Sequence, residues 1–163
     1  MSVHSAPLTE IGRLLDNYFI YLFVLLVLIV FGEQRNSKRL KIFCALCLTL
    51  AATTFVKIQT DHERPCFGEP GCPTDAAFPS THAALAFTLM IAFLNKPSYP
   101  IYLLFALFVC FTRLNLGVHT FEDIAGALPF ALISYYIIDL IFDDLYQKGL
   151  NIWKGKMNAR SSI

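Results

Sequence analysis

The chain has 163 residues, of which 56% are hydrophobic and only 15% are charged, and its formal net charge at pH 7 is +1. A soluble domain of this length does not need so apolar a composition, which indicates that lipid surrounds much of the chain. Lys and Arg residues form no stripe that could follow a phosphate backbone, so nucleic-acid binding is excluded. No repeat or composition shift divides the sequence, and residues 1–163 are predicted to form one membrane-embedded domain.

The first predicted element is an amphipathic helix at residues 7–17, which carries Leu8, Ile11, Leu14 and Leu15 at helical spacing. This pattern suits a helix lying on the membrane interface, and it equally suits a short helix packed on the rest of the protein. The apolar segment that follows is not expected to be a cleaved signal peptide, because a polar, basic stretch follows it instead of a small-residue cleavage site.

Five apolar segments then predict an all-α integral membrane bundle with about five transmembrane helices. They lie at residues 18–31, 42–56, 80–95, 97–113 and 124–141. The third and fourth have short apolar cores and reach roughly 16 and 17 residues only when their polar ends are included, which suits a thin bundle.

The basic residues between and after these segments predict their orientation. One side of the membrane receives the first link, the turn before residue 97 and the C-terminal tail, with Arg35, Lys38, Arg39, Lys41, Lys96, Lys148, Lys154, Lys156 and Arg160. The positive-inside rule places this side in the cytoplasm. The polar stretches at residues 57–77 and 113–122 are therefore expected on the opposite, extracytoplasmic side.

These two outward stretches carry three cations, Lys57, Arg64 and Arg113, close to the expected membrane surface. Charged groups are costly beside lipid unless they share a ligand of opposite charge. Arginine offers a planar fork of donors to phosphate oxygens and lysine a compact charge, so the three side chains suit a phosphoryl group. Ser80 stands where the third segment begins, and a serine at a helix N-terminus adds a further anion-binding position.

Two histidines accompany the cations. His119 and Asp123 are four residues apart and share one helical face if a helix begins near Thr120, so the carboxylate can orient the imidazole. A neutral imidazole held in this way can attack phosphorus and form a phosphohistidine. His82 can then protonate the departing oxygen and later activate water.

The three blocks together resemble the type 2 phosphatidic acid phosphatase superfamily, integral membrane lipid phosphatases whose sites are related to those of vanadium haloperoxidases. The family pattern is Lys, six residues, Arg-Pro; Pro-Ser-any-His; and Ser-Arg, five residues, His, three residues, Asp. Residues 57–65, 79–82 and 112–123 match it in order and spacing, with Thr112 in place of the usual serine. The resemblance implies His119 as nucleophile, Asp123 as its partner, His82 as acid, and phosphate binding by Lys57, Arg64, Ser80 and Arg113. It implies no metal and no cofactor.

The expected function is therefore hydrolysis of a terminal phosphate from a membrane lipid at the extracytoplasmic face of the cell (inner) membrane. A polyprenyl diphosphate, phosphatidic acid, phosphatidylglycerol phosphate and a phosphorylated lipid A all present such a group. The expected partners are this lipid phosphate and the bilayer, and the sequence does not predict an oligomeric state. Transfer of the phosphoryl group to a second lipid, or binding of lipid phosphate without turnover, are the alternatives, although mere binding needs no nucleophile.

Simpler interpretations exist for the separate motifs. A lone Pro-Ser-Thr-His is usually a helix cap, and His119 with Asp123 could ligate zinc if a third ligand joined them. Cys66 and Cys72 flank a short loop that an oxidising compartment would allow to close as a disulfide, and free thiols fit the sequence as well.

Overall fold

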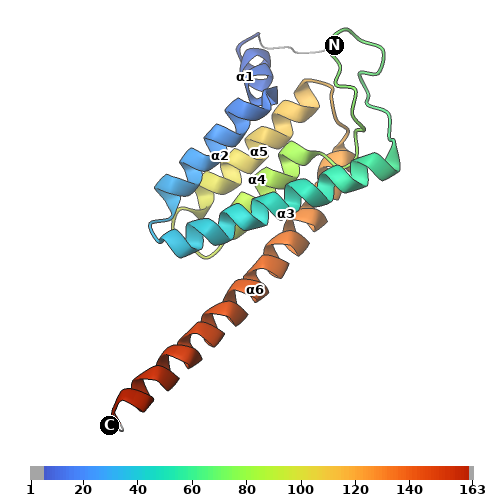
Figure 1. Cartoon of the computed structure of the whole chain (residues 1–163). Helices are drawn as coiled ribbons and strands as arrows, with labels where there is room; N and C mark the ends of the chain where they lie inside the picture. Colours follow the sequence, from blue (N-terminus) through green and yellow to red (C-terminus); the bar gives the residue numbers. More distant parts are fainter. Residues whose placement is uncertain (1–5, 162–163) are drawn as a thin grey trace.

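The computed structural model describes residues 6–161, which form six α-helices and no strand (Figure 1). The helices are α1 (Ala6–Asp16), α2 (Tyr18–Gly32), α3 (Asn36–Thr60), α4 (Thr81–Ala92), α5 (Tyr99–Asn115) and α6 (Phe121–Ser161). The predicted all-α fold is confirmed. Each of the five predicted apolar segments forms a helix, and α1 matches the predicted amphipathic helix closely.

The short helix α4 lies at the centre of the bundle and packs against α3, α5 and α6. Most of its side chains are buried, and the small residues Ala83, Ala84 and Ala86 let neighbouring helices approach closely. The hydroxyls of Thr88 and Thr49 form a buried hydrogen bond of 2.8 Å between α4 and α3. Apolar side chains of α2, α3, α4 and α5 complete the main core.

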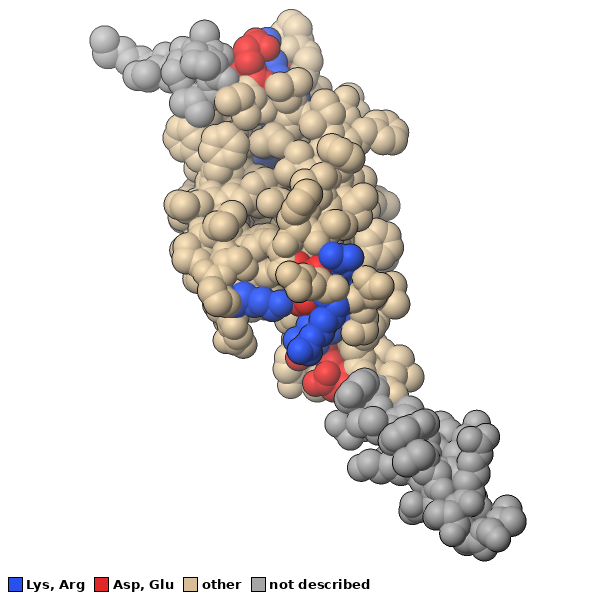
Figure 2. Space-filling model, turned by 90° about the vertical axis from the view of Figure 1, so that its left-hand side faces the viewer, with Lys and Arg blue, Asp and Glu red and all other residues tan. Residues whose placement is uncertain are grey.

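Among the described residues, two helices are long and apolar enough to cross a membrane: α3, and α6 over Phe121–Leu145. A third span exists if α1 and α2, bent by 88° at their junction, count as one broken span. Helices α4 and α5 are apolar but have only 12 and 17 residues. Figure 2 shows a broad uncharged band between charged side chains near the two ends, as expected of an integral membrane bundle.

The chain directions of the helices bring the three motif blocks of the sequence to one end of the bundle. This end contains the C-terminal ends of α3 and α5 and the N-terminal ends of α2, α4 and α6 (Figure 1). Because α1 turns sharply away from α2, it crosses onto α5, where Gly12 packs against Leu116. At the opposite end, buried Glu33 pairs with Lys96, and Lys41 pairs with Asp139.

A long loop, residues 61–80, connects α3 to α4 over the motif end. A disulfide joins Cys66 to Cys72, so the structure contains the bonded alternative for this pair. The backbone N–H of Ala77 donates to the carbonyl of His62 at 2.7 Å, which closes the base of the loop. This bond holds the segment that leads into α4 in place over the motif end of the bundle.

Candidate active site

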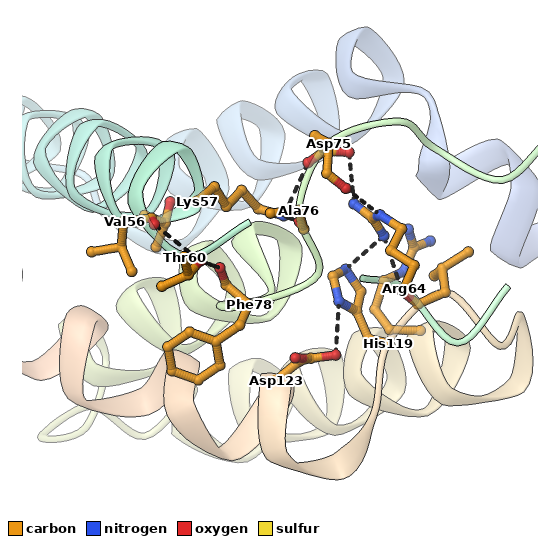
Figure 3. A network of polar contacts seen from close by, with 12 residues as sticks. Val56, Lys57, Thr60, Arg64, Asp75, Ala76, Phe78, His119 and Asp123 are labelled. Carbon is orange, nitrogen blue, oxygen red and sulfur yellow. Dashed lines mark hydrogen bonds and ion pairs between the residues drawn. The ribbon is translucent and has the colours of Figure 1, made fainter. Parts of the chain in front are cut away.

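Two of the predicted phosphate-binding cations meet at one carboxylate in the loop (Figure 3). Lys57 Nζ, from the last turn of α3, lies 2.9 Å from Asp75 Oδ2, and Arg64 Nη2 lies 2.7 Å from Asp75 Oδ1. Lys57 also donates to the carbonyl of Ala76. Both cations are buried, whereas the side chain of Asp75 is 47% exposed. The cations are thus fixed in the protein, and the carboxylate facing them is accessible to solvent.

The third predicted cation, Arg113, comes from the last turn of α5 and is 1% exposed. Its Nη1 lies 2.5 Å from Asp16 Oδ1, and its Nη2 donates to the carbonyl of Gly12 at 3.0 Å. Both partners belong to the C-terminal end of α1. The amphipathic helix is therefore part of this site's wall.

His119 lies between the arginine of the loop and the start of α6 (Figure 3). Its Nε2 is 3.3 Å from Arg64 Nη1, and its Nδ1 is 3.5 Å from Asp123 Oδ2. Asp123 is held by a capping box with Thr120: the backbone N–H of Thr120 donates to Asp123 Oδ2 at 2.7 Å, and that of Asp123 donates to Thr120 Oγ1 at 3.2 Å. The same carboxylate caps α6 and faces the imidazole.

The ionisation states follow from these surroundings. Burial, and then the positive charges of Arg64, Lys57 and Arg113, lower the pKa of His119 to about 2, so the imidazole is neutral at pH 7. Burial alone would raise the pKa of Asp75, but the hydrogen bond and charge of Lys57, with Arg64, outweigh it and hold that pKa below its usual value. Asp75 is therefore an anion facing two cations.

Ser80 and His82 lie at the start of α4. Ser80 precedes the helix as predicted, but its hydroxyl does not cap it, and its backbone N–H donates to the carbonyl of Asp123 at 3.0 Å. Within the part of the chain whose side chains the structure describes, four buried side-chain nitrogen or oxygen atoms lack a hydrogen-bond partner. They are Ser80 Oγ, His82 Nε2, Arg113 Nε and His119 Nδ1. All four belong to predicted site residues, which indicates a site built for a polar ligand.

A cavity of about 180 Å³ lies beside three of these four residues. It is lined by Lys57, Arg64, His82, Arg113 and His119, whereas Ser80 and Asp123 are buried and do not line it. The structure thus brings all seven predicted site residues to one place. Among the described residues, no three His, Cys, Asp or Glu side chains are grouped in a way that could hold a metal ion.

Sequence reasoning missed four side chains at this cavity: Asp16, Tyr18, Tyr21 and Asp75. Asp16, Tyr18 and Asp75 line the cavity, and the rings of Tyr18 and Tyr21 contact the ring of His82. None belongs to a motif. The signal available for Asp16 and Tyr18 was the break between the amphipathic and apolar segments, which predicts a change of chain direction without saying where it leads.

Residues 38–146, about two thirds of the chain, match the model of the PAP2 superfamily. The chain belongs to the PAP2 superfamily. The matched region contains all three motif blocks, whereas α1 and α2 lie outside it.

Two proteins illustrate the similarity. Human sphingosine-1-phosphate phosphatase 2 is 38% identical, over 39% of this chain and 18% of the relative's length. The crystal structure of a transmembrane PAP2-type phosphatidylglycerolphosphate phosphatase from Bacillus subtilis matches with a TM-score of 0.62 and 19% identity, over 85% of this chain and 74% of that one. At this identity the second match concerns the fold alone, and it shows that the bundle has a PAP2-type fold.

Proposed function

We propose that this protein is an integral membrane phosphatase that removes a terminal phosphate from a lipid through a phosphohistidine intermediate. The observation that carries the proposal is the convergence of two histidines, His82 and His119, with three buried cations on one cavity. Cations alone would serve binding. A neutral imidazole facing a carboxylate, with a second imidazole beside it, supplies the nucleophile and acid that phosphoryl transfer requires.

In the first step, His119 attacks phosphorus. A proton on Nδ1, facing Asp123, leaves the lone pair on Nε2, which accepts from Arg64 Nη1 in the empty site. Arg64 therefore has to donate to a phosphate oxygen instead before Nε2 can attack phosphorus. A bond forms between Nε2 and phosphorus while the bond from phosphorus to the lipid oxygen breaks. His82 acts here as an imidazolium, which the negative charge of the bound phosphate favours, and gives its proton to that departing oxygen, so the lipid leaves as an alcohol or as a monophosphate.

In the second step, His82 takes a proton from water, and the resulting hydroxide attacks phosphorus. The bond between phosphorus and His119 breaks and inorganic phosphate is released. Lys57, Arg64 and Arg113 neutralise the charge that accumulates on the equatorial oxygens in both steps. For phosphate to reach these cations, it has to replace the carboxylates of Asp75 and Asp16.

A membrane lipid is the substrate class that suits the surroundings of the cavity. Tyr18, Lys57, Asp75 and Thr81 also line a second cavity of about 380 Å³, which extends between α2 and α3 along Thr54 and Ile58. Further along the same two helices lies an apolar pocket of about 270 Å³. A phosphate bound by the cations can therefore continue into a hydrocarbon chain between α2 and α3. The named relatives, a sphingosine-1-phosphate phosphatase and a phosphatidylglycerolphosphate phosphatase, also carry names of lipid phosphate enzymes.

The test is phosphate release by the purified protein from a panel of polyprenyl diphosphate, phosphatidic acid, phosphatidylglycerol phosphate and phosphorylated lipid A, with EDTA present. We expect release from at least one lipid, inhibition by vanadate, which mimics five-coordinate phosphorus, and no release by His119→Ala. Phosphate bound covalently to the enzyme should be acid-labile and absent from His119→Ala, with Asp123→Asn intermediate in rate. Activity that EDTA abolishes and zinc restores would overturn the metal-free mechanism, and phosphate recovered only on a second lipid would identify a transferase.

A further inference from the structure

The two histidines of the site are held in different ways. His119 faces a carboxylate, Asp123, at 3.5 Å. His82, in contrast, lies against two aromatic rings of α2: its ring centroid is 4.7 Å from that of Tyr18 and 4.6 Å from that of Tyr21, with tilts of 39° and 51°. Tilted aromatic pairs at this separation attract each other through their quadrupoles in addition to burying area.

The two tyrosines are placed for this contact by the helix itself. They are three residues apart, so both rings project from the same face of α2. Asn17 caps the helix by accepting from the backbone N–H groups of Phe19 and Ile20, at 3.0 and 3.4 Å, and so fixes Tyr18 in the first turn. The 88° bend before α2 brings this first turn to the motif end of the bundle.

Tyr21 also holds the backbone of His82. It is completely buried, and its hydroxyl donates to the carbonyl of His82 at 2.7 Å, across 61 residues of sequence. The bond ties the first turn of α4 to the first turn of α2. Tyr21 therefore fixes both the ring and the backbone of the histidine, whereas Tyr18 contacts the ring and lines the cavity.

We infer that Tyr18 and Tyr21 are positioning residues that aim the imidazole of His82 at the leaving oxygen of the lipid. This inference rests on the proposed function, and it adds α2, which the family match does not include, to the active site. The location supports it: Tyr18 lines both the cation cavity and the cleft between α2 and α3, and the bond that breaks joins the phosphate in the first to the lipid in the second.

The experiment compares an alkyl lipid phosphate with an aryl phosphate, whose leaving group needs little protonation. Loss of proton donation slows only the alkyl substrate, whereas damage to the fold slows both. His82→Ala, which has no proton donor at this position, shows how far the rate on the alkyl substrate can fall relative to the aryl one. We expect Tyr18→Leu and Tyr21→Leu to lower kcat/KM on the alkyl substrate relative to the aryl one on the order of 10-fold, a part of the roughly 10²–10⁴ that acid catalysis contributes. The ratio kcat/KM reports the steps up to departure of the leaving group and so excludes the later activation of water by His82. Tyr18→Phe, which keeps the ring, should retain the wild-type ratio.

Tyr102 provides the matched control. It is also a buried tyrosine, its hydroxyl donates to the carbonyl of Leu28 in α2 at 2.9 Å, and its ring stacks on Phe93. Tyr102→Leu removes the same atoms without touching His82, so it should leave the ratio of the two rates unchanged. Equal losses on both substrates in Tyr18→Leu and Tyr21→Leu, matching Tyr102→Leu, would overturn the positioning role.

A second measurement separates this inference from the proposed function. In protein labelled with ¹³C and ¹⁵N at its four histidines, the ring protons of His82 should show upfield shifts from the two tyrosine rings, assigned by their loss in His82→Gln. Tyr18→Leu should reduce these shifts, whether or not the protein hydrolyses any lipid tried. A wild-type protein that shows no such shift contradicts the contact, and a shifted but inactive protein contradicts the proposed function alone.

Discussion

At the scale of single residues, the cations of the site are buried and held in place, whereas the carboxylates facing them can be displaced by a ligand. Lys57, Arg64 and Arg113 have side chains between 1% and 8% exposed, whereas the carboxylates of Asp75 and Asp16 are 47% and 40% exposed. Ion pairs with a buried partner keep the cations in place before substrate arrives. The partly exposed carboxylates can turn into solvent when a phosphate takes their position.

Replacing Asp75 by asparagine should therefore strengthen the binding of phosphate analogues. The substitution removes the anion that competes for Lys57 and Arg64, and we expect vanadate to inhibit Asp75→Asn at roughly 2- to 5-fold lower concentration, which is the range of partly exposed ion pairs. Glu63→Gln removes an exposed carboxylate from the same loop and should leave the inhibition constant unchanged. Weaker inhibition of Asp75→Asn would show that Asp75 organises the cations and does not compete with the ligand.

The same substitution should lower stability at neutral pH only. Because the pKa of Asp75 is lower in the folded protein than its ordinary value of 3.8, its ionised form favours folding above that pH, and the contribution is lost as pH falls through the folded pKa. The unfolding temperature of Asp75→Asn should thus lie below that of the wild type at pH 7. The two should converge in strongly acidic solution.

The motif residues could be predicted from the sequence because their types and spacing carry the chemistry. Lys57 and His119 could be recognised because each has a motif partner at a fixed spacing in the sequence, Arg64 for Lys57 and Asp123 for His119. Asp75 and Asp16 could not be predicted, because their partners lie 11 and 97 residues away and depend on the path of a loop and on the bend between two helices. No local sequence pattern predicts the course of that loop or the direction of that bend.

At the scale of helices, α6 packs closely against the loop before α4 at Gly126. A Cβ atom on this residue would lie 2.2 and 2.7 Å from two ring carbons of Phe78, so the ring has to move if the glycine is replaced. Phe78 is two residues before Ser80 and four before His82. The packing of α6 is therefore connected to the position of the acid.

Gly126→Ala should lower both stability and activity, since overpacking typically costs about 1–3 kcal/mol. Phe78→Leu in the same chain makes room and should restore a large part of both, giving a clear coupling in a double-mutant cycle measured by unfolding temperature and phosphate release. Ala125→Val enlarges an exposed neighbour on the same helix and should have little effect. Strictly additive effects of the two substitutions would contradict the contact.

Helix positions followed from apolar runs, but helix lengths did not. The segment expected at residues 124–141 belongs to a helix that spans Phe121–Ser161, and the one expected at 42–56 to Asn36–Thr60. Polar turns at both ends continue these helices beyond the apolar stretch that reveals them. The bend of 88° between α1 and α2 was also not predicted, although it decides what α1 and α2 contribute to the site.

At the scale of the whole molecule, the two ends of the bundle use positive charge differently. The three cations of the site are buried and paired, and Arg13 of α1 is exposed at the same end. At the other end, Arg35 in the link before α3 and Lys38 in the first turn of α3 are exposed. Exposed basic residues beside a membrane helix favour the cytoplasmic side. The arrangement supports our proposal that the site opens to the extracytoplasmic face of the cell membrane.

Thiol labelling of intact cells tests this orientation. The disulfide of Cys66 and Cys72 lies in the loop at the site end, and Ser37 is exposed at the other end, in the first turn of α3. After mild reduction, a reagent that cannot cross membranes should modify Cys66 or Cys72 on intact cells, whereas Ser37→Cys should react only after lysis. Labelling of the Cys66→Ser, Cys72→Ser double variant gives the background from the remaining cysteines. If Ser37→Cys reacts on intact cells and the loop cysteines react only after lysis, the bundle is inverted and the substrate has to be a lipid phosphate of the cytoplasmic leaflet.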